Sequence, residues 1–338
     1  MKLILETITP VHIVSGETID PYEYIITDKL YKINLWNFIS SLNARDEENF
    51  LEISSSDMVK TRLFIKEKAD LSNKRNSKML VTEYSMNVNQ DAYNIYADKI
   101  RDPNNQLSIQ TFIKTLDIPF IPGSSVKGPI RTALLFSMAD KPITDTYNIQ
   151  QNTFKFKNAQ DDPFRALSIS DSLPIDLNNM LVCPVMTYTK NKKKGDKFEE
   201  SGYIILVEGT NSFYTDKAIK ISHNITIDYR LQKQNNFIDI NADKIASSCN
   251  EFYQRVIEEE LNFYDNSDTS YAYDIYKTLE KDLHSFEKEG VFMLRLGWGS
   301  GYNSLTINLA KKTPDSKISR RLIRGEFPLG WVKAKIVE

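Results

Sequence analysis

The chain has 338 residues, of which 41% are apolar and 26% are charged, and its formal net charge is −2. This ordinary globular composition excludes wholesale disorder, and the length suggests about two domains. Two cysteines and three histidines are too few and too scattered for a zinc cluster or a disulfide framework, so we expect no metal and no other cofactor. No apolar run approaches the ~20 residues that a bilayer span requires, and Glu6 and Pro10 interrupt the N-terminal stretch, so we expect an unprocessed cytoplasmic protein.

The hydrophobic pattern mixes strands and helices along the chain. Strands are expected at residues 2–8, 24–26, 30–33, 106–114, 166–170, 182–189, 203–207, 213–222, 291–296 and 329–336. Helices are expected at 35–42, 125–138, 241–264 and 270–289, and the charge-dense stretch 44–77 suggests one surface helix and a loose segment. Because strands and helices do not alternate regularly, the pattern favours the α+β class over a doubly wound sheet.

Charge is distributed unevenly. Residues 250–290 hold four basic side chains against eleven acids, a net of −7, whereas residues 311–338 hold eight Lys/Arg against three acids, a net of +5. One part of the surface could therefore hold a polyanion, while another would repel it or meet a basic protein. The alternative is a patchwork of ordinary solvated surfaces.

The segment 120–131 has the properties of an anion site at a helix N-terminus. Gly123 frees the turn, and Ser124 or Ser125 can cap the helix, whose exposed N–H groups favour an anion. Lys127 and Arg131 are four residues apart and therefore lie on one helix face. A phosphate is the natural ligand, and the alternative is a capped helix with two solvated cations.

Two resemblances to nucleotide-binding loops fail on spacing. A P-loop needs its lysine after the second glycine, but here Lys127 precedes Gly128 and Pro129 follows. The glycines at 297, 299 and 301 follow a strand, yet too little chain remains for a dinucleotide-binding unit. Three glycines in five positions do allow close backbone approach, with Trp298 and Tyr302 beside them, although a plain turn has the same composition.

Other candidates are weaker. His12 lies between apolar residues and is more typical of a packed side chain than of a catalyst. Asp20 and Glu23 flank a short loop from which a carboxylate could assist RNA hydrolysis, but they are also typical turn residues. The basic loop 190–197 is either solvated or touches phosphates.

Three segments together resemble the RAMP superfamily of CRISPR-associated RNA-binding proteins. They are Thr-Pro-Val-His-Ile-Val-Ser-Gly at 9–16, Ile-Pro-Gly-Ser-Ser-Val-Lys-Gly at 121–128 followed by Arg131, and Leu-Gly-Trp-Gly-Ser-Gly at 296–301. Their order, with the tail 329–335, most resembles the fifth subunit of type III-A (Csm) interference complexes. Pro129 stands where such proteins usually have a small residue.

The resemblance implies a ferredoxin/RRM-like core at 1–164 and a degenerate RRM-like half at 165–338 that contains the helical segment 241–289. It implies a non-catalytic subunit that caps the 3′-proximal end of the guide RNA (crRNA) and supports crRNA maturation and antiviral defence. The implied partners are crRNA, backbone RAMP and small subunits of the complex, host nucleases that trim crRNA, and, indirectly, target RNA.

The resemblance also implies which residues contact guide RNA. These are His12, Ser15, Gly16, Gly123, Ser124, Ser125, Lys127, Gly128, Arg131, Gly297, Trp298, Gly299, Ser300 and Gly301. In related backbone subunits an acidic loop residue cuts target RNA, and Asp20 lies in a comparable stretch.

The residues themselves favour sequence-tolerant binding to an RNA backbone, because they are glycines, hydroxyls and cations rather than stacked aromatics. One alternative is an endoribonuclease that cuts guide precursor through His12 or target RNA through Asp20. Another is an assembly scaffold that uses the acidic helices.

Overall fold

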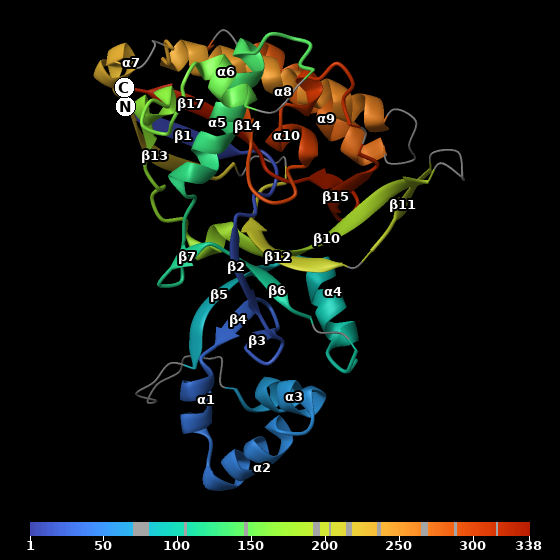
Figure 1. Cartoon of the computed structure of the whole chain (residues 1–338). Coiled ribbons are helices and arrows are strands. Elements are labelled where there is room, and N and C mark those ends of the chain that lie inside the picture. The colour runs from blue at the N-terminus through green and yellow to red at the C-terminus, as the bar shows by residue number, and fades with distance from the viewer. Residues whose placement is uncertain are drawn as a thin grey trace.

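The structure is a computed structural model, shown in Figure 1. Its described residues are 1–69, 81–104, 107–144, 148–191, 197–202, 204–213, 218–234, 238–264, 270–286, 289–315 and 317–338. Two curled sheets follow one another along the molecule, and helices cover the outer end of one of them (Figure 1). This arrangement confirms the expected α+β class.

The first sheet joins the two ends of the chain. Within the described residues its order is β14-β17-β1-β13-β9, and every neighbouring pair is antiparallel. The strands are β1 (Lys2–Thr7), β9 (Leu167–Ile169), β13 (Lys220–Ile227), β14 (Val291–Arg295) and β17 (Trp331–Val337). Leu5 of β1 lies opposite Ile221 of β13 and Ala334 of β17. The two termini consequently lie close together (Figure 1).

The second sheet has the order β2-β6-β12-β10-β5-β4-β3, with β11, β15 and β16 attached, as far as the chain is described. Its strands are β2 (Val14–Ile19), β3 (Tyr24–Ile26), β4 (Leu30–Ile33), β5 (Thr82–Val88), β6 (Ile109–Phe112), β10 (Met180–Asn191), β11 (Lys197–Glu200), β12 (Ile205–Thr210), β15 (Ser319–Ile323) and β16 (Phe327–Pro328), and a small hairpin is formed by β7 (Lys114–Thr115) and β8 (Ile118–Pro119). Strands from both sides of residue 164 contribute to both sheets, and the domain boundary there stays a prediction.

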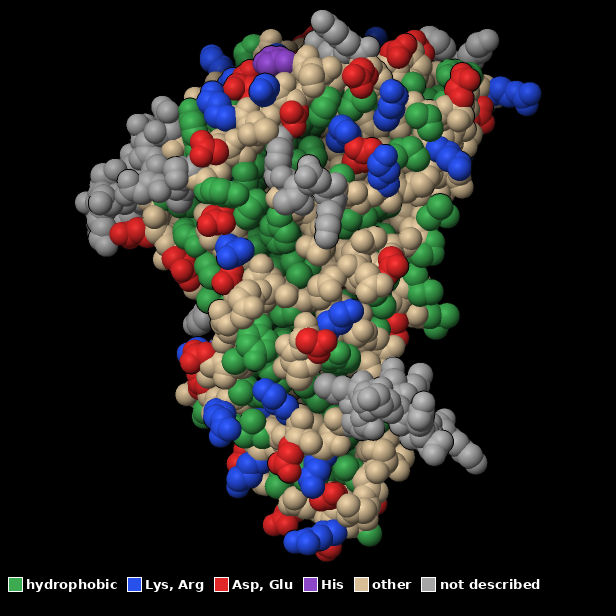
Figure 2. Space-filling view, turned by 180° about the vertical axis from the view of Figure 1, so that it is seen from behind, with side chains coloured by type: hydrophobic (Ala, Val, Ile, Leu, Met, Phe, Trp, Pro, Cys, Tyr) green, Lys and Arg blue, Asp and Glu red, His purple; other side chains and the backbone are tan. Residues whose placement is uncertain are grey.

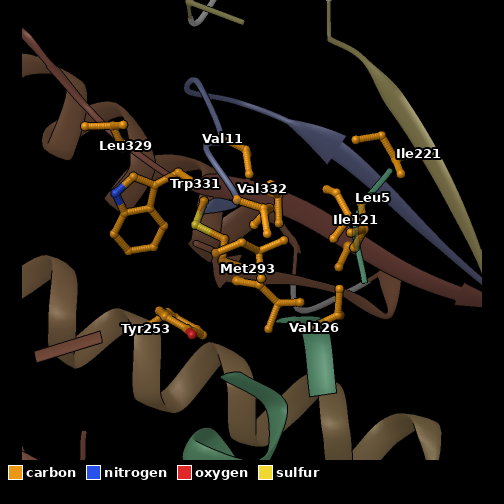
Figure 3. Close-up of a cluster of buried hydrophobic side chains, with 14 of the residues drawn as sticks. Leu5, Val11, Ile121, Val126, Ile221, Tyr253, Met293, Leu329, Trp331 and Val332 are labelled. Carbon is orange, nitrogen blue, oxygen red and sulfur yellow. The ribbon is translucent and has the colours of Figure 1, made fainter. Parts of the chain in front are cut away.

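Three helices cover the first sheet: α5 (Gly123–Met138), α8 (Ala242–Tyr264) and α9 (Ser270–Phe286). In Figure 3 Val126 of α5 and Tyr253 of α8 lie beneath Met293, Trp331 and Val332 of the sheet. The apolar spacing of α8 puts its buried residues on one face, as expected for an amphipathic helix. Other helices of the described residues are α4 (Gln90–Lys99), α6 (Ile149–Phe154), α7 (Tyr229–Gln234) and α10 (Tyr302–Leu305), and short 3-10 turns lie at Pro163–Ala166, Leu177–Asn179 and Asn308–Ala310. In the described part of the chain, no helix is both long and apolar enough to cross a membrane.

The prediction of a single helix within 44–77 is wrong, because two helices lie within this stretch. The structure has α1 (Leu35–Ser41), α2 (Ala44–Ser54) and α3 (Met58–Lys68) at the far end of the molecule (Figure 1). The Asn43 and Asp57 side chains accept hydrogen bonds from the first turns of α2 and α3, so a second cap starts a second helix. Phe38, Phe50 and Phe64 pack together in a small separate core. The many polar residues around them gave no clear hydrophobic pattern from which to predict this core.

Other boundaries also differ from the expectations. β13 begins at Lys220, so the predicted strand at 213–222 overlaps it only at its end. Ser15 and Gly16 belong to β2, where the sequence predicted no strand, and the register of β2 with β6 shifts between Val14 and Thr18. The basic loop 190–197 joins β10 to β11, and its residues 192–196 lie outside the described residues.

Candidate nucleic-acid interface

Residues 8–13, here called the crossing segment, pass from the first sheet to the second. The Ile8 N–H donates to the Trp331 carbonyl of β17 at 2.9 Å. The Val11 N–H donates to the Thr210 hydroxyl of β12 at 2.9 Å, and the Thr210 N–H returns a bond to the Val11 carbonyl at 3.0 Å. Because buried backbone groups need partners, these bonds determine where His12 lies.

His12 is fully buried between the sheets. Its Nδ1 lies 2.6 Å from the Glu208 carbonyl oxygen, which can only accept, so Nδ1 carries the proton. The ring meets the Trp298 ring edge-on, with centroids 5.7 Å apart. Burial lowers the pKa of His12 to about 4, so the imidazole is neutral at pH 7. The His12 side chain therefore presents no surface to RNA in this structure, and a contact between His12 and RNA stays a prediction that its burial does not support.

Glu208 is a second fully buried polar residue at this junction. Its carboxylate accepts hydrogen bonds from the Tyr84 hydroxyl and the Phe112 N–H, each at 2.8 Å, and it forms an ion pair with Lys114. A buried carboxylate is tolerated when its lone pairs are satisfied in this way. The network therefore holds β5, β6 and β12 against the crossing segment.

The glycine loop, residues 297–301, lies against the crossing segment. The Trp298 N–H donates to the His12 carbonyl at 2.9 Å, and a Cβ at Gly297 would lie 2.3 Å from that carbonyl oxygen. A Cβ at Gly299 would lie 3.2 Å from Leu329, and the buried Ser300 hydroxyl donates to the Gly297 carbonyl at 2.8 Å. The close backbone approach that the glycines allow is therefore made, at Gly297, to the protein's own crossing segment.

Helix α5 begins differently from the expectation. Its N-cap is Pro122, which has no side chain to donate or accept a capping bond, so the cap predicted at Ser124 or Ser125 is wrong. A Cβ at Gly123 would lie 2.0 Å from the Ile169 carbonyl oxygen, so this residue packs directly on β9. The Gly123 N–H donates to the Asp171 carboxylate at 2.9 Å. One donor of the expected anion site is thus already bound to a carboxylate of the chain.

The two cations of α5 have different surroundings. Arg131 pairs with Asp162 at 2.8 Å, donates to Gln150 at 2.9 Å and lies 4.6 Å from the Phe164 ring centroid. Lys127 is half-buried, and burial lowers its pKa while Asp162 opposes that shift. Arg131 is therefore held within the protein. The helix continues through Pro129, while Ser124 and Gly128 are exposed and Ser125 is half-buried.

Ser15, Gly16 and Asp20 lie on or beside β2. The Ser15 hydroxyl is 2.5 Å from that of Thr111, and Gly16 is exposed, with φ +92° and no atom within 4 Å of a Cβ built there. The Asp20 carboxylate accepts from Ser108 at 2.9 Å and from Tyr22 at 3.0 Å. Among the residues that the structure describes, no three His, Cys, Asp or Glu side chains cluster as metal ligands would.

The structure also brings the basic stretch 311–338 to the glycine loop, which the sequence alone did not indicate. The two border a cavity of about 260 Å³, here called the arginine cavity. The exposed Arg321 guanidinium lies 4.3 Å from the Trp298 ring centroid, and the exposed Lys317 ammonium lies 4.6 Å from that of Tyr302. The lining residues are Thr187, Glu260, Tyr264, Arg295, Gly299, Gly301, Tyr302, Asn303, Lys317, Ser319, Arg320, Arg321 and Leu322. In the sequence, the net charge of +5 over residues 311–338 was the one signal that this stretch could take part in a binding site.

Several acids of residues 250–290 form ion pairs with basic side chains of the same protein. Glu258 and Glu259 pair with Arg255 at 3.1 and 2.9 Å, and the buried Glu260 pairs with Arg320 at 2.7 Å. Figure 2 shows Lys/Arg and Asp/Glu side chains interspersed on the face opposite Figure 1, with apolar side chains between them. The negative potential at this surface is therefore weaker than the number of acids suggests.

The segments that form this candidate interface lie within, or close to, a part of the chain that matches a known protein family in sequence. The family model of the RAMP superfamily matches residues 4–304, and the chain belongs to this superfamily.

Within the superfamily the chain is homologous to Csm5 proteins. It is 27% identical over 353 residues to the CRISPR system Cms protein Csm5 of Methanocaldococcus jannaschii, covering 97% of this chain and 78% of that protein. It is 25% identical over 218 residues to the protein of the same name from Streptococcus thermophilus, covering 57% of each. The fold is similar to a chain in a cryo-EM structure of a Csm–crRNA–target RNA ternary complex of a type III-A CRISPR-Cas system, with a TM-score of 0.71 and 20% identity over 99% of this chain and 100% of that one. The crystal structure of T. onnurineus Csm5 gives a TM-score of 0.66 and 19% identity over 97% and 99% of the two chains.

We predict that Gly297→Ala destabilises the protein more than Gly301→Ala. Both glycines have a positive φ, +74° and +83°, that non-glycine residues rarely adopt, so both changes carry a backbone strain of ~1–3 kcal/mol. Only Gly297 adds a clash with a backbone carbonyl, because the nearest atom to a Cβ at Gly301 is 3.8 Å away. Thermal unfolding of the two variants measures the difference. Equal losses would contradict the close approach of the glycine loop to His12.

We predict that His12 makes stability depend on pH between about 4 and 6.5. The folded pKa is about 4 against the ordinary 6.5, so the unfolded chain binds the proton more readily and stability falls as the pH falls through this window. From pH 7 to pH 5 the loss is ~2 kcal/mol by this linkage. His12→Asn, whose amide can replace the Nδ1 donor, should weaken this dependence in urea unfolding, while the buried His223, whose pKa burial also lowers, keeps its own contribution. The exposed His284→Asn is the control and should keep it. Identical pH profiles for wild type and His12→Asn would contradict the assignment.

Proposed function

We propose that this protein is a non-catalytic guide-RNA-binding subunit of a type III-A CRISPR effector complex. The observation that carries the proposal is the pair of exposed cations, Arg321 and Lys317, held over aromatic rings beside the glycine loop. Cations and open backbone can contact phosphates without reading bases, which suits guide RNAs that differ in sequence. The RAMP family membership and the homology to Csm5 support the same conclusion.

We further propose that the subunit caps the 3′-proximal end of crRNA and supports its maturation for antiviral defence in the cytoplasm. One structurally similar chain belongs to a complex with crRNA and target RNA, which supports an assembled role here. Its partners would be crRNA, the backbone RAMP and small subunits, and nucleases that trim crRNA. The acidic outer faces of α8 and α9 would then face protein, because like charges repel the RNA backbone.

The first sheet supports a ferredoxin/RRM-like core. In the order β17-β1-β13-β9, β1 and β9 run parallel with β13 between them, and α5 lies between β1 and β9 in the chain. In the same way β13 and β17 run parallel with β1 between them, and α8 lies between β13 and β17 in the chain, together with α9 and β14. Two such split β-α-β units make up the ferredoxin-like arrangement. The second, degenerate RRM-like half remains our proposal from the resemblance.

We predict that Arg321→Gln with Lys317→Gln lowers the salt dependence of RNA binding. If each cation neutralises one phosphate, the slope of log K against log salt for single-stranded RNA falls by about 1.4, at ~0.7 per phosphate. The change should be the same for poly(U) and poly(A). Fluorescence anisotropy of the full chain across a salt series measures it.

The matched control is Lys312→Gln with Lys335→Gln, which removes two exposed cations of the same basic stretch away from the arginine cavity. It should keep the wild-type slope. Equal slopes in the test pair and the wild type would contradict RNA contact at this site. A loss limited to one base sequence would mean that the site reads bases.

We also predict that the protein does not cleave RNA. The Asp20 carboxylate is already bonded to Ser108 and Tyr22, and His12 is buried, so neither of the two candidates is placed to attack or protonate a phosphodiester. Incubation of labelled guide precursor and target RNA with the protein and Mg²⁺ should leave both intact. Cleavage that disappears in Asp20→Asn would establish the endoribonuclease alternative.

A further inference from the structure

Arg295, the last residue of β14, is a buried cation in the wall of the arginine cavity. It is 3% exposed, its Nε donates to the Leu329 carbonyl at 3.0 Å, and its Nη1 lies 3.4 Å from the Ser304 hydroxyl. Its guanidinium also lies 5.2 Å from the Trp331 ring centroid. These partners are neutral, and none of the ion pairs formed by the described residues includes Arg295. The positive charge is therefore enclosed without a counter-charge.

The acid in the lining of the cavity already has a partner in the same lining. Glu260 is the one acid among the described residues that line the cavity, and it is 3% exposed. Its carboxylate accepts from the Arg320 Nε at 2.7 Å, and that guanidinium also covers the Phe263 ring at 3.8 Å. Glu260 and Arg320 thus neutralise one another. Because an uncompensated buried charge is strongly unfavourable, the remaining charge of Arg295 indicates a missing anion.

The rest of the cavity is suited to a small anion. Arg321 and Lys317 bring two more positive charges to its mouth, and Gly299 and Gly301 leave one wall without side chains. Thr187, Ser319 and Asn303 in the lining add neutral hydrogen-bonding groups. The volume of about 260 Å³ is below the ~300–1,000 Å³ of sites that enclose whole small-molecule ligands, so a compact group fits better than a complete nucleotide.

We propose that the arginine cavity binds one phosphoryl group, with Arg295 at its inner wall and Arg321 and Lys317 at its mouth. A guanidinium presents parallel N–H donors that match two oxygens of a phosphate. The group can belong to an RNA phosphodiester, to an RNA end or to free phosphate. Where guide RNA is its source, the inference rests on the proposed function.

The experiment is a thermal titration of the full chain with sodium phosphate against sodium chloride at matched ionic strength. Wild-type protein should show a saturable rise in Tm with phosphate only, because a ligand of the folded state stabilises it. Arg295→Met should retain or raise the Tm in chloride, since it removes an enclosed charge, and should lose the phosphate response. An unaltered phosphate response in Arg295→Met, or no saturable rise in the wild type, would overturn the proposal.

A second pair of variants keeps the test decisive if Arg295→Met fails to fold. Arg321→Gln, at the exposed mouth, should weaken the apparent phosphate affinity about tenfold, as expected for losing one charged hydrogen bond. Lys312→Gln removes an exposed charge of the same basic stretch that does not line the cavity, and it should leave the affinity unchanged. Equal phosphate affinity in Arg321→Gln and Lys312→Gln would count against the site.

Two further ligands identify the source of the phosphoryl group. Stabilisation by the dinucleotide UpU, which has a single internal phosphodiester, would support an RNA backbone phosphate. Stabilisation by uridine 3′-monophosphate and inorganic phosphate, but not by UpU, would support the phosphate site and identify its ligand as an RNA end or free phosphate. A chain that is stabilised by phosphate but binds no single-stranded RNA would overturn the proposed function and leave the phosphate site standing.

Discussion

The crossing segment, residues 8–13, carries the backbone out of one sheet and into the other through the interior of the protein. Its amide and carbonyl groups are buried, so each requires a partner, and they find partners in Trp331 on one side and Thr210 on the other. The two sheets cannot slide relative to one another without breaking these bonds. The same segment presents the His12 carbonyl to the glycine loop, so the position of the candidate interface depends on this crossing.

Next to the crossing lies the buried carboxylate of Glu208. With hydrogen bonds from Tyr84 and Phe112 and an ion pair with Lys114, its charge is satisfied, whereas removing one partner of a buried pair typically costs ~3–5 kcal/mol. His12 shares this environment and stays neutral because burial lowers its pKa. The packed side chain that the sequence favoured for His12 is thus part of the junction between the sheets.

Several charged side chains form ion pairs with residues far away in the sequence. Arg131 meets Asp162, 31 residues away, and Arg320 meets Glu260, 60 residues away. These pairs explain why the cations of α5 and the acids of α8 contribute less to an external field than their positions in the sequence suggest. The charges left at the arginine cavity, on Arg295 and at its mouth, are those that lack such partners or are exposed beside the glycine loop.

The local pattern of the sequence determined the α+β class, the strand that opens the chain, the hairpin at 24–33 and the amphipathic helices α8 and α9, because these depend on the spacing of neighbouring residues. The three motif segments likewise indicated the RAMP superfamily. Only the tertiary structure decided that Pro122 and Asp171 take over the start of α5, that Gly297 meets His12, and that Arg295 is enclosed without an acid. Those contacts follow from the order of strands in the two sheets, which brings together residues whose distance along the chain leaves no periodic signal.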